Sequence, residues 1–277
     1  MNPDDQETCC GGDSLPPLPQ AGRVTGTEVC IAEAFGVRTL HLGTSWVQGS
    51  MLLNAPFDIE LEYVRRMMGW LLFVEPDSVQ QRQALQLGLG AATLTKFCHR
   101  RLGMRTTAVE INPQVVAVCR QSFELPDDGD RLQVLLADAG TEIRRPEHQG
   151  RFDAVQLDVY DHRVEAPLLD SVAFYADCRE LLTPDGCLAL NCTGIRHRLD
   201  ITLAHLVQVF GRDAVLVFWP TREGNTVVLA RRAPAQPDRA TWLARARVIQ
   251  ERWGLSTERW LSVLESVGDT ASPTIID

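Results

Sequence analysis

The stretch from Ala84 to Glu110 restricts the possible folds of this chain more than any other. Apolar runs predict two buried strands, Ala84–Leu87 and Thr106–Val109, with a helical pattern between them. The first strand ends at Gly88-Leu89-Gly90, where the missing Cβ lets the backbone approach a ligand closely. The second ends at Glu110, whose carboxylate can accept both hydroxyls of a ribose. Strand, glycine turn, helix, strand and terminal acid predict the first half of a nucleotide-binding βαβ unit.

Strands and helices alternate along the chain that follows. Helices are expected at Pro113–Gln121, Leu168–Leu182 and about residues 200–210, and strands at Leu132–Leu136, Ala154–Leu157, Cys187–Asn191, Ala214–Phe218 and Thr226–Ala230. The turn signal Pro184-Asp185-Gly186 precedes one of these strands, and the short link Pro220–Asn225 predicts that the last two pair antiparallel as a hairpin. The pattern predicts an α/β fold with a doubly wound, mostly parallel, seven-stranded Rossmann-like sheet, of the class I S-adenosylmethionine-dependent methyltransferase type.

The regions flanking this sheet predict further segments. Two strands around a turn at Phe35-Gly36, and a third near Ser45–Leu53, predict a small antiparallel β-appendage. A helix is expected over Asp58–Phe73, with Asp58 as its N-cap. The expected division is a disordered tail at 1–22, the β-appendage at 23–57, the Rossmann-like adenosyl-ligand domain at 58–235, and two short C-terminal helices at 236–277.

Composition and charge restrict the classes of partner that this protein is expected to bind. No stretch approaches the ~20 apolar residues that span a bilayer, and the N-terminus lacks the features of a signal peptide, so a cytoplasmic protein is expected. The net charge of −9 argues against a nucleic-acid surface and is compatible with cationic substrates. Apart from Cys9-Cys10 the cysteines are scattered singly, and the histidines have no ligand-like spacing. We therefore expect no metal and no prosthetic group.

The bound nucleotide can be a dinucleotide or an adenosyl-sulfonium. A dinucleotide fingerprint requires a small residue where this chain has Thr93, which counts against a pyrophosphate clamp. Asp138 and Asp158 directly follow the third and fourth strands, so with Glu110 three acids are expected at the edge where such sheets bind ligands. Glu110 would bind the ribose, Asp138 the adenine amino group, and Asp158 would face the reacting centre. This favours the adenosyl-sulfonium; the alternative is that these acids cap turns or helices.

Several short motifs occur in a recognisable order. They are Phe35-Gly36 between two strands, Gln48, Glu62-Tyr63 followed by Met67, Gly88-x-Gly90, Val109-Glu110-Ile111-Asn112, Ala137-Asp138-Ala139, and Asp158-Val-Tyr-Asp161 followed by Phe174-Tyr175. On these motifs the chain resembles the spermidine synthases, the polyamine aminopropyltransferases, from Glu28 to about Arg231. The Asp-x-x-Asp with an aromatic pair at the family distance is the most specific.

The resemblance implies a reaction. Family members transfer the aminopropyl group of decarboxylated S-adenosylmethionine to an amine such as putrescine, and release methylthioadenosine. It also implies that the donor is bound by Gln48, Gly88, Gly90, Glu110 and Asp138. Asp158 is the expected base, which takes a proton from an amine that is protonated at neutral pH, while Asp161 and Tyr63 bind that amine. The expected partner is a small polyamine, and a homodimer is possible because the family forms oligomers.

Other positions depart from the family pattern. An acid of the glycine loop is replaced by Ala91, an acid after the fifth strand by Asn191-Cys192-Thr193, and a late tyrosine by Arg222; basic residues occur at Arg65-Arg66 and Arg196-His197-Arg198. The donor residues are thus mostly retained, whereas the putrescine pocket is not. The basic run at 196–198 can equally be a solvated face.

Three hypotheses therefore stay open. The first is an aminopropyltransferase, with an acceptor that the sequence does not identify. The second is an S-adenosylmethionine-dependent methyltransferase, which the missing acid at Ala91 favours, because the methionine carboxylate would be repelled by an acid there. The third is a non-catalytic protein that binds the adenosyl ligand. The pair Asp158 and Asp161 favours the first, since neither alternative needs it.

Overall fold

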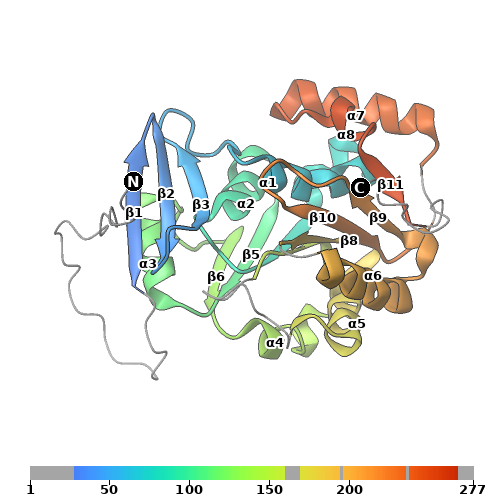
Figure 1. Cartoon of the computed structure of the whole chain (residues 1–277), viewed down its shortest axis with the longest axis horizontal. Helices are drawn as coiled ribbons and strands as arrows, with labels where there is room; N and C mark the ends of the chain where they lie inside the picture. The colour runs from blue at the N-terminus through green and yellow to red at the C-terminus, as the bar shows by residue number, and fades with distance from the viewer. Residues whose placement is uncertain (1–27, 160–168, 194–195, 235–236, 268–277) are drawn as a thin grey trace, which may run out of the picture.

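Two β-sheets organise the chain (Figure 1). The computed structural model describes residues 28–159, 169–193, 196–234 and 237–267. The smaller sheet has the antiparallel order β1-β2-β3 and consists of β1 Val29–Ala34, β2 Val37–Leu42 and β3 Val47–Leu52. This is the three-stranded appendage that the sequence predicts, with Phe35 and Gly36 at positive φ in the first turn.

The larger sheet has the order β11-β9-β10-β8-β7-β4-β5-β6. Its strands are β4 Gln83–Leu87, β5 Arg105–Glu110, β6 Leu132–Leu136, β7 Phe152–Leu157, β8 Leu182–Cys192, β9 Val215–Phe218, β10 Thr226–Arg231 and β11 Leu264–Ser266. The five strands from β8 to β6 in this order run parallel, and β9 and β10 pair antiparallel as predicted. The expected seven strands are joined by an eighth, β11, which pairs with β9; three residues are too short for a sequence pattern to reveal.

Helices cover both faces of the larger sheet (Figure 1). The α-helices are α1 Glu62–Arg66, α2 Thr93–Lys96, α3 Pro113–Ser122, α4 Ala139–Glu142, α5 Val172–Leu181, α6 Arg196–Phe210, α7 Arg239–Trp253 and α8 Thr257–Trp260. The 3-10 segments are η1 Met67–Phe73, η2 Pro76–Gln81, η4 Pro146–His148 and η6 Arg212–Ala214, and η3 Phe97–Arg101 is a π-helical turn. One apolar core joins η1, α2 and α7 to the sheet, and a second joins α5 and α6 to its other face.

The helix expected over Asp58–Phe73 is shorter than predicted. The α-helix begins at Glu62, and η1 continues it as a 3-10 segment whose seven residues are all buried. Asp58 is not the N-cap; its carboxylate pairs with Arg101 at 2.9 Å. Leu61, which makes no side-chain capping hydrogen bond, occupies the N-cap position instead.

Helix α5 and strand β8 also differ from the predicted bounds. Ser171 caps α5, because its hydroxyl accepts the amide of Phe174 at 3.2 Å. The expected turn at Pro184-Asp185-Gly186 lies within β8, whose register against β7 shifts between Phe152 and Ala154. The turn residues form an irregularity in the strand and do not end it. At the C-terminus α7 is a full 15-residue helix, longer than expected.

Candidate active site

A cavity of about 850 Å³ lies at the carboxyl ends of β4, β5, β6 and β7, and β3 contributes to its wall. Every predicted site residue that the structure describes lines it: Gln48, Tyr63, Gly88, Gly90, Glu110, Asp138 and Asp158. Asp161, the predicted second carboxylate, lies outside the described residues. The ends of the parallel strands thus bring together Gly88 and Asp158, which are 70 positions apart in the chain, as a parallel sheet predicts.

The glycine loop is a point of close backbone approach. Gly88 has φ +84°, and a Cβ there would lie 2.3 Å from the carbonyl oxygen of Asp158. A Cβ on Gly90, at φ +51°, would lie 2.9 Å from the carbonyl oxygen of Gln48. On β3, a Cβ on Gly49 would lie 2.6 Å from the amide nitrogen of Ala91. The sequence pattern did not single out Gly49, because its constraint comes from a segment about 40 positions away.

Gly88→Ala should lower the free energy of unfolding by about 2 kcal/mol, because the new methyl group meets a backbone carbonyl and the residue keeps a left-handed φ. Urea titration measures the change. Gly129→Ala is the matched control, since a Cβ at Gly129 meets nothing within 4 Å. Equal losses in the two variants would contradict the close approach at Gly88.

Thr93 occupies the sixth position of the glycine fingerprint. Its hydroxyl donates to the carbonyl oxygen of Ser50 at 2.9 Å and so ties the start of α2 to β3. A position that dinucleotide-binding proteins fill with a small residue is used here to attach the appendage.

Glu110 ends β5 with both carboxylate oxygens anchored. Oε2 accepts the amide of Leu89 at 2.9 Å, and Oε1 accepts the amide of Asn112 at 2.8 Å. Burial raises the pKa of Glu110 above its ordinary value, and the backbone hydrogen bonds oppose the rise. Because each oxygen can accept a second hydrogen bond, this oriented carboxylate retains capacity for two ligand hydroxyls.

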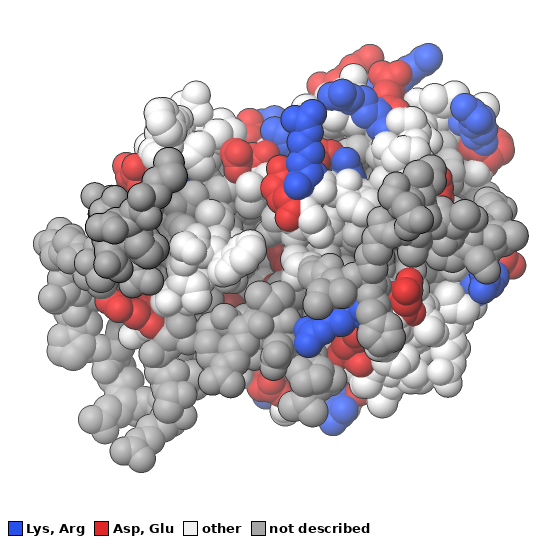
Figure 2. Space-filling view, in the orientation of Figure 1, with Lys and Arg blue, Asp and Glu red and all other residues white. Residues whose placement is uncertain are grey.

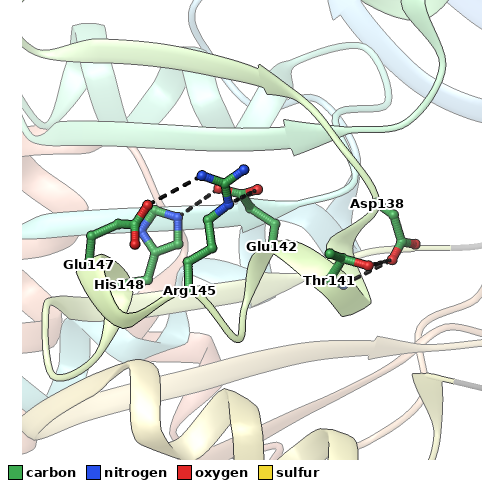
Figure 3. A network of polar contacts seen from close by, with 6 residues as sticks. All are labelled: Asp138, Thr141, Glu142, Arg145, Glu147 and His148. Carbon is green, nitrogen blue, oxygen red and sulfur yellow. Dashed lines mark hydrogen bonds and ion pairs between the residues drawn. The ribbon is translucent and has the colours of Figure 1, made fainter.

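Asp138 combines a capping role with a place in the cavity. Its Oδ1 accepts the amide of Thr141 at 2.9 Å and the Thr141 hydroxyl at 2.8 Å, so it caps α4 (Figure 3). On the same short helix, buried Glu142 lies 2.9 Å from Nε2 of buried His148 and 2.9 Å from Nε of Arg145 (Figure 3). Asp138 therefore caps α4 and also lines the cavity, so the two predicted roles do not exclude each other.

Asp158 directly follows β7 and its side chain lines the cavity. Its amide donates to the Leu87 carbonyl oxygen at 3.0 Å, which fixes the backbone against β4. Oδ1 accepts Nδ2 of Asn191 at 2.9 Å, and the Tyr63 hydroxyl lies 3.5 Å from Oδ2. Burial raises the pKa of Asp158 to about 6, and the two side-chain hydrogen bonds oppose the rise. Near neutral pH this carboxylate is ionised and is a stronger base than a solvated aspartate.

Two asparagines of the cavity wall were missed as functional candidates. The sequence indicated Asn191, near the end of β8, only as a position where the family has an acid. In the structure its side chain contacts Asp158 directly. Asn225 lies just before β10, and its Nδ2 donates to Oδ1 of Asn191 at 3.1 Å. The predicted hairpin could have indicated that these two asparagines lie close together. It pairs the start of β10 with the end of β8, with Thr226 opposite Cys192.

Three of the basic departures, Arg65, Arg66 and Arg198, do not line the cavity. Arg65 donates through Nε to the Ile59 carbonyl oxygen at 2.8 Å, and Arg66 pairs with Glu62 at 2.9 Å. Arg198 is exposed at the start of α6. Because none of these three arginines lines the cavity, they do not oppose a cationic amine at short range.

Charged side chains of both signs occur on the surface of the described part (Figure 2). Figure 2 shows acidic and basic side chains interspersed on the visible face, without one broad basic patch among the coloured residues. No described helix is long and apolar enough to cross a membrane. In the same residues no group of three or more His, Cys, Asp and Glu side chains is arranged to hold a metal ion.

The fold is of the class I methyltransferase type. The fold is similar to a probable spermidine synthase from Corynebacterium glutamicum, with a TM-score of 0.67, 19% identity and coverage of 94% of this chain and 100% of that one. It is also similar to human methyltransferase-like protein 13 in complex with SAH, with a TM-score of 0.62, 24% identity and coverage of 77% and 98%. No family model matches the chain.

The sequence similarity is more specific than the fold. The polyamine aminopropyltransferase of Neisseria meningitidis serogroup B is 35% identical over 241 residues, which cover 86% of this chain and 89% of that protein. The chain belongs to the polyamine aminopropyltransferase family. It is therefore an enzyme of the transferase class, as the sequence predicts.

Proposed function

We propose that this protein transfers the aminopropyl group of decarboxylated S-adenosylmethionine to putrescine or a related polyamine, and releases methylthioadenosine. The observation that carries the proposal is the half-buried carboxylate of Asp158, which lines the same cavity as the glycine loop and Glu110. An amine acceptor requires such a base, because an alkylammonium with a pKa near ~10 has no lone pair for attack.

The donor occupies the β4–β5 side of the cavity in this proposal. The backbone at Gly88 and Gly90 allows close approach, Glu110 accepts the ribose hydroxyls, and Gln48 closes the site from β3. Asp138 has a carboxylate oxygen beyond the one that caps α4, and this oxygen accepts the adenine amino group. The buried surroundings favour a reaction in which the sulfonium charge disappears.

The chemical step is a displacement at carbon. The nitrogen lone pair forms a bond to the aminopropyl carbon next to sulfur, and the carbon–sulfur bond breaks with its electron pair staying on sulfur. The sulfonium becomes the neutral thioether of methylthioadenosine, and the proton of the attacking amine passes to Asp158. Tyr63 and Asp161 hold the amine in line with that bond.

Methyl transfer from S-adenosylmethionine is the second candidate. The observation that favours it is Ala91, which is buried against Gly49 and supplies no carboxylate for the ammonium group of a decarboxylated donor. An intact donor carries a carboxylate, which an acid at this position would repel.

Calorimetric titration with decarboxylated S-adenosylmethionine, S-adenosylmethionine and methylthioadenosine tests the proposal, followed by assays of methylthioadenosine release with a panel of amines. We expect a preference for the decarboxylated donor and release that requires an amine. Preference for the intact donor would support methyl transfer instead. Binding of none of the three compounds would contradict the proposal that this cavity binds an adenosyl ligand. The cytoplasmic location and the homodimer stay predictions.

A further inference from the structure

Two buried amide side chains connect the base to the hairpin at the edge of the cavity. Asn191 is 3% exposed and Asn225 is 9% exposed. Nδ2 of Asn225 donates to Oδ1 of Asn191 at 3.1 Å, and Nδ2 of Asn191 donates to Oδ1 of Asp158 at 2.9 Å. Three side chains from the β10 start, the β8 end and the β7 end thus form one hydrogen-bonded row.

The chemistry of the amide group gives this row a direction. An ionised carboxylate only accepts hydrogen bonds, so Asn191 must present its NH2 group to Asp158. Its carbonyl oxygen then faces Asn225, which must supply the donor. A reversed Asn191 would place a carbonyl oxygen against the carboxylate, which is unfavourable in a buried site.

The far end of the row is fixed by the hairpin turn. The Thr221 amide donates to the Asn225 carbonyl oxygen at 2.8 Å, and the Asn225 amide donates to the Thr221 hydroxyl at 3.3 Å. The backbone of Asn225 is therefore held in place, and its side chain can orient the next amide without a large entropic cost.

We propose that Asn225 and Asn191 are positioning residues that fix the Asp158 carboxylate, so that Oδ1 is occupied and Oδ2 receives the proton of the acceptor amine. The catalytic consequence rests on the proposed aminopropyl transfer. The described groups near Asp158 from other elements are the Tyr63 hydroxyl of α1 and the backbone of Gly88. Glu110, Asp138 and Glu223 are the other carboxylates in the cavity wall.

An amide at position 191 has an advantage over an acid. A carboxylate there would lie within hydrogen-bonding distance of the Asp158 carboxylate. Two carboxylates so close cannot both be ionised, so they would share one proton. With a shared proton, the Asp158 carboxylate would not be free to take a proton from the amine at neutral pH. Asn191 supplies the hydrogen bond without the second charge.

Asn225→Leu tests the positioning role, because it removes the donor and keeps the number and branching of the side-chain heavy atoms. We expect kcat to fall about 10- to 100-fold, the amount expected for one hydrogen bond that acts on a charged group, with the donor KM unchanged. In protein labelled with carbon-13 at aspartate carboxyls, the Asp158 titration midpoint should rise, with Asp158→Asn used to assign the signal. Asn191→Asp should give two coupled midpoints, the upper one above that of the unmodified protein.

Thr257→Val is the control for a lost buried hydrogen bond. Its hydroxyl donates to Ala246 in the C-terminal helices, outside the cavity wall, so it should lower stability without changing kcat or the midpoint. Asn225→Ser, whose side chain is one bond shorter, replaces Asn225→Leu if the latter does not fold. Unchanged kcat and an unchanged midpoint in both Asn225 variants would overturn the proposal. If the unmodified protein releases no methylthioadenosine, the proposed function fails, whereas the carboxyl titration still decides whether the row exists.

Discussion

Asp158→Asn should lower the turnover number by at least about 100-fold, the usual contribution of a positioned general base. Asparagine has nearly the same shape, and its Oδ1 still accepts Nδ2 of Asn191, so the cavity wall is expected to stay in place. The asparagine side chain cannot take a proton from the attacking amine. Affinity for methylthioadenosine should therefore be preserved while release of methylthioadenosine is lost.

Rates of methylthioadenosine release and calorimetric affinities measure the two quantities separately. Asp153→Asn is the matched control, because Asp153 lies on the same strand at its opposite end, where it pairs with Arg82 at 2.8 Å. Retained turnover in Asp158→Asn would remove Asp158 as the base. In the unmodified enzyme, kcat/KM should fall as the pH drops below about 6, because the base becomes protonated.

Asp158→Asn should also raise the free energy of unfolding at neutral pH. The pKa of Asp158 is about 6 in the folded protein and about 3.8 when solvated, so the folded state binds more protons between these values. The free energy of unfolding therefore falls as the pH rises through this window, and stays lower above it. Asp158→Asn removes this penalty and should add up to about 3 kcal/mol at pH 7.5 but little below about pH 4. Urea titrations at both pH values measure the difference.

Glu110→Ala should weaken binding of methylthioadenosine by at least about 100-fold. Two hydrogen bonds between ribose hydroxyls and an oriented carboxylate would be lost, each with a contribution of about 1.5–3 kcal/mol. Calorimetry measures the affinity, and unchanged binding would exclude the ribose assignment.

Adenine alone separates loss of ribose binding from damage to the loop. Because Glu110 also accepts the amides of Leu89 and Asn112, its removal can disturb the glycine turn. Affinity for adenine should be equal in the variant and the unmodified protein if only the ribose contacts are lost. Glu33→Ala, which removes an exposed acid paired with Arg38 on the appendage, serves as the control.

The nucleotide-binding unit could be predicted because its signals are local. Apolar runs, the glycine turn after Leu87 and the acids after each strand follow from strand periodicity and from the geometry of parallel sheets. Once the strands are assigned, Glu110, Asp138 and Asp158 must meet at one edge, and the structure places them around one cavity. The capping role of Asp138 could only be stated as an alternative, since a strand-end acid serves either purpose.

Other parts of the site depend on contacts that no local pattern records. Gly49 is required by the approach of Ala91, and the partnership of Asn191 with Asn225 depends on the register of an antiparallel hairpin. Asp58 likewise pairs with Arg101 although its position suits a helix cap. The sequence by itself determined which segments of the nucleotide unit are strands and which acids follow them, because these features follow from short-range periodicity. Only the tertiary structure decided which neutral side chains support Asp158, because such pairs form wherever packing brings distant strand ends within hydrogen-bonding distance.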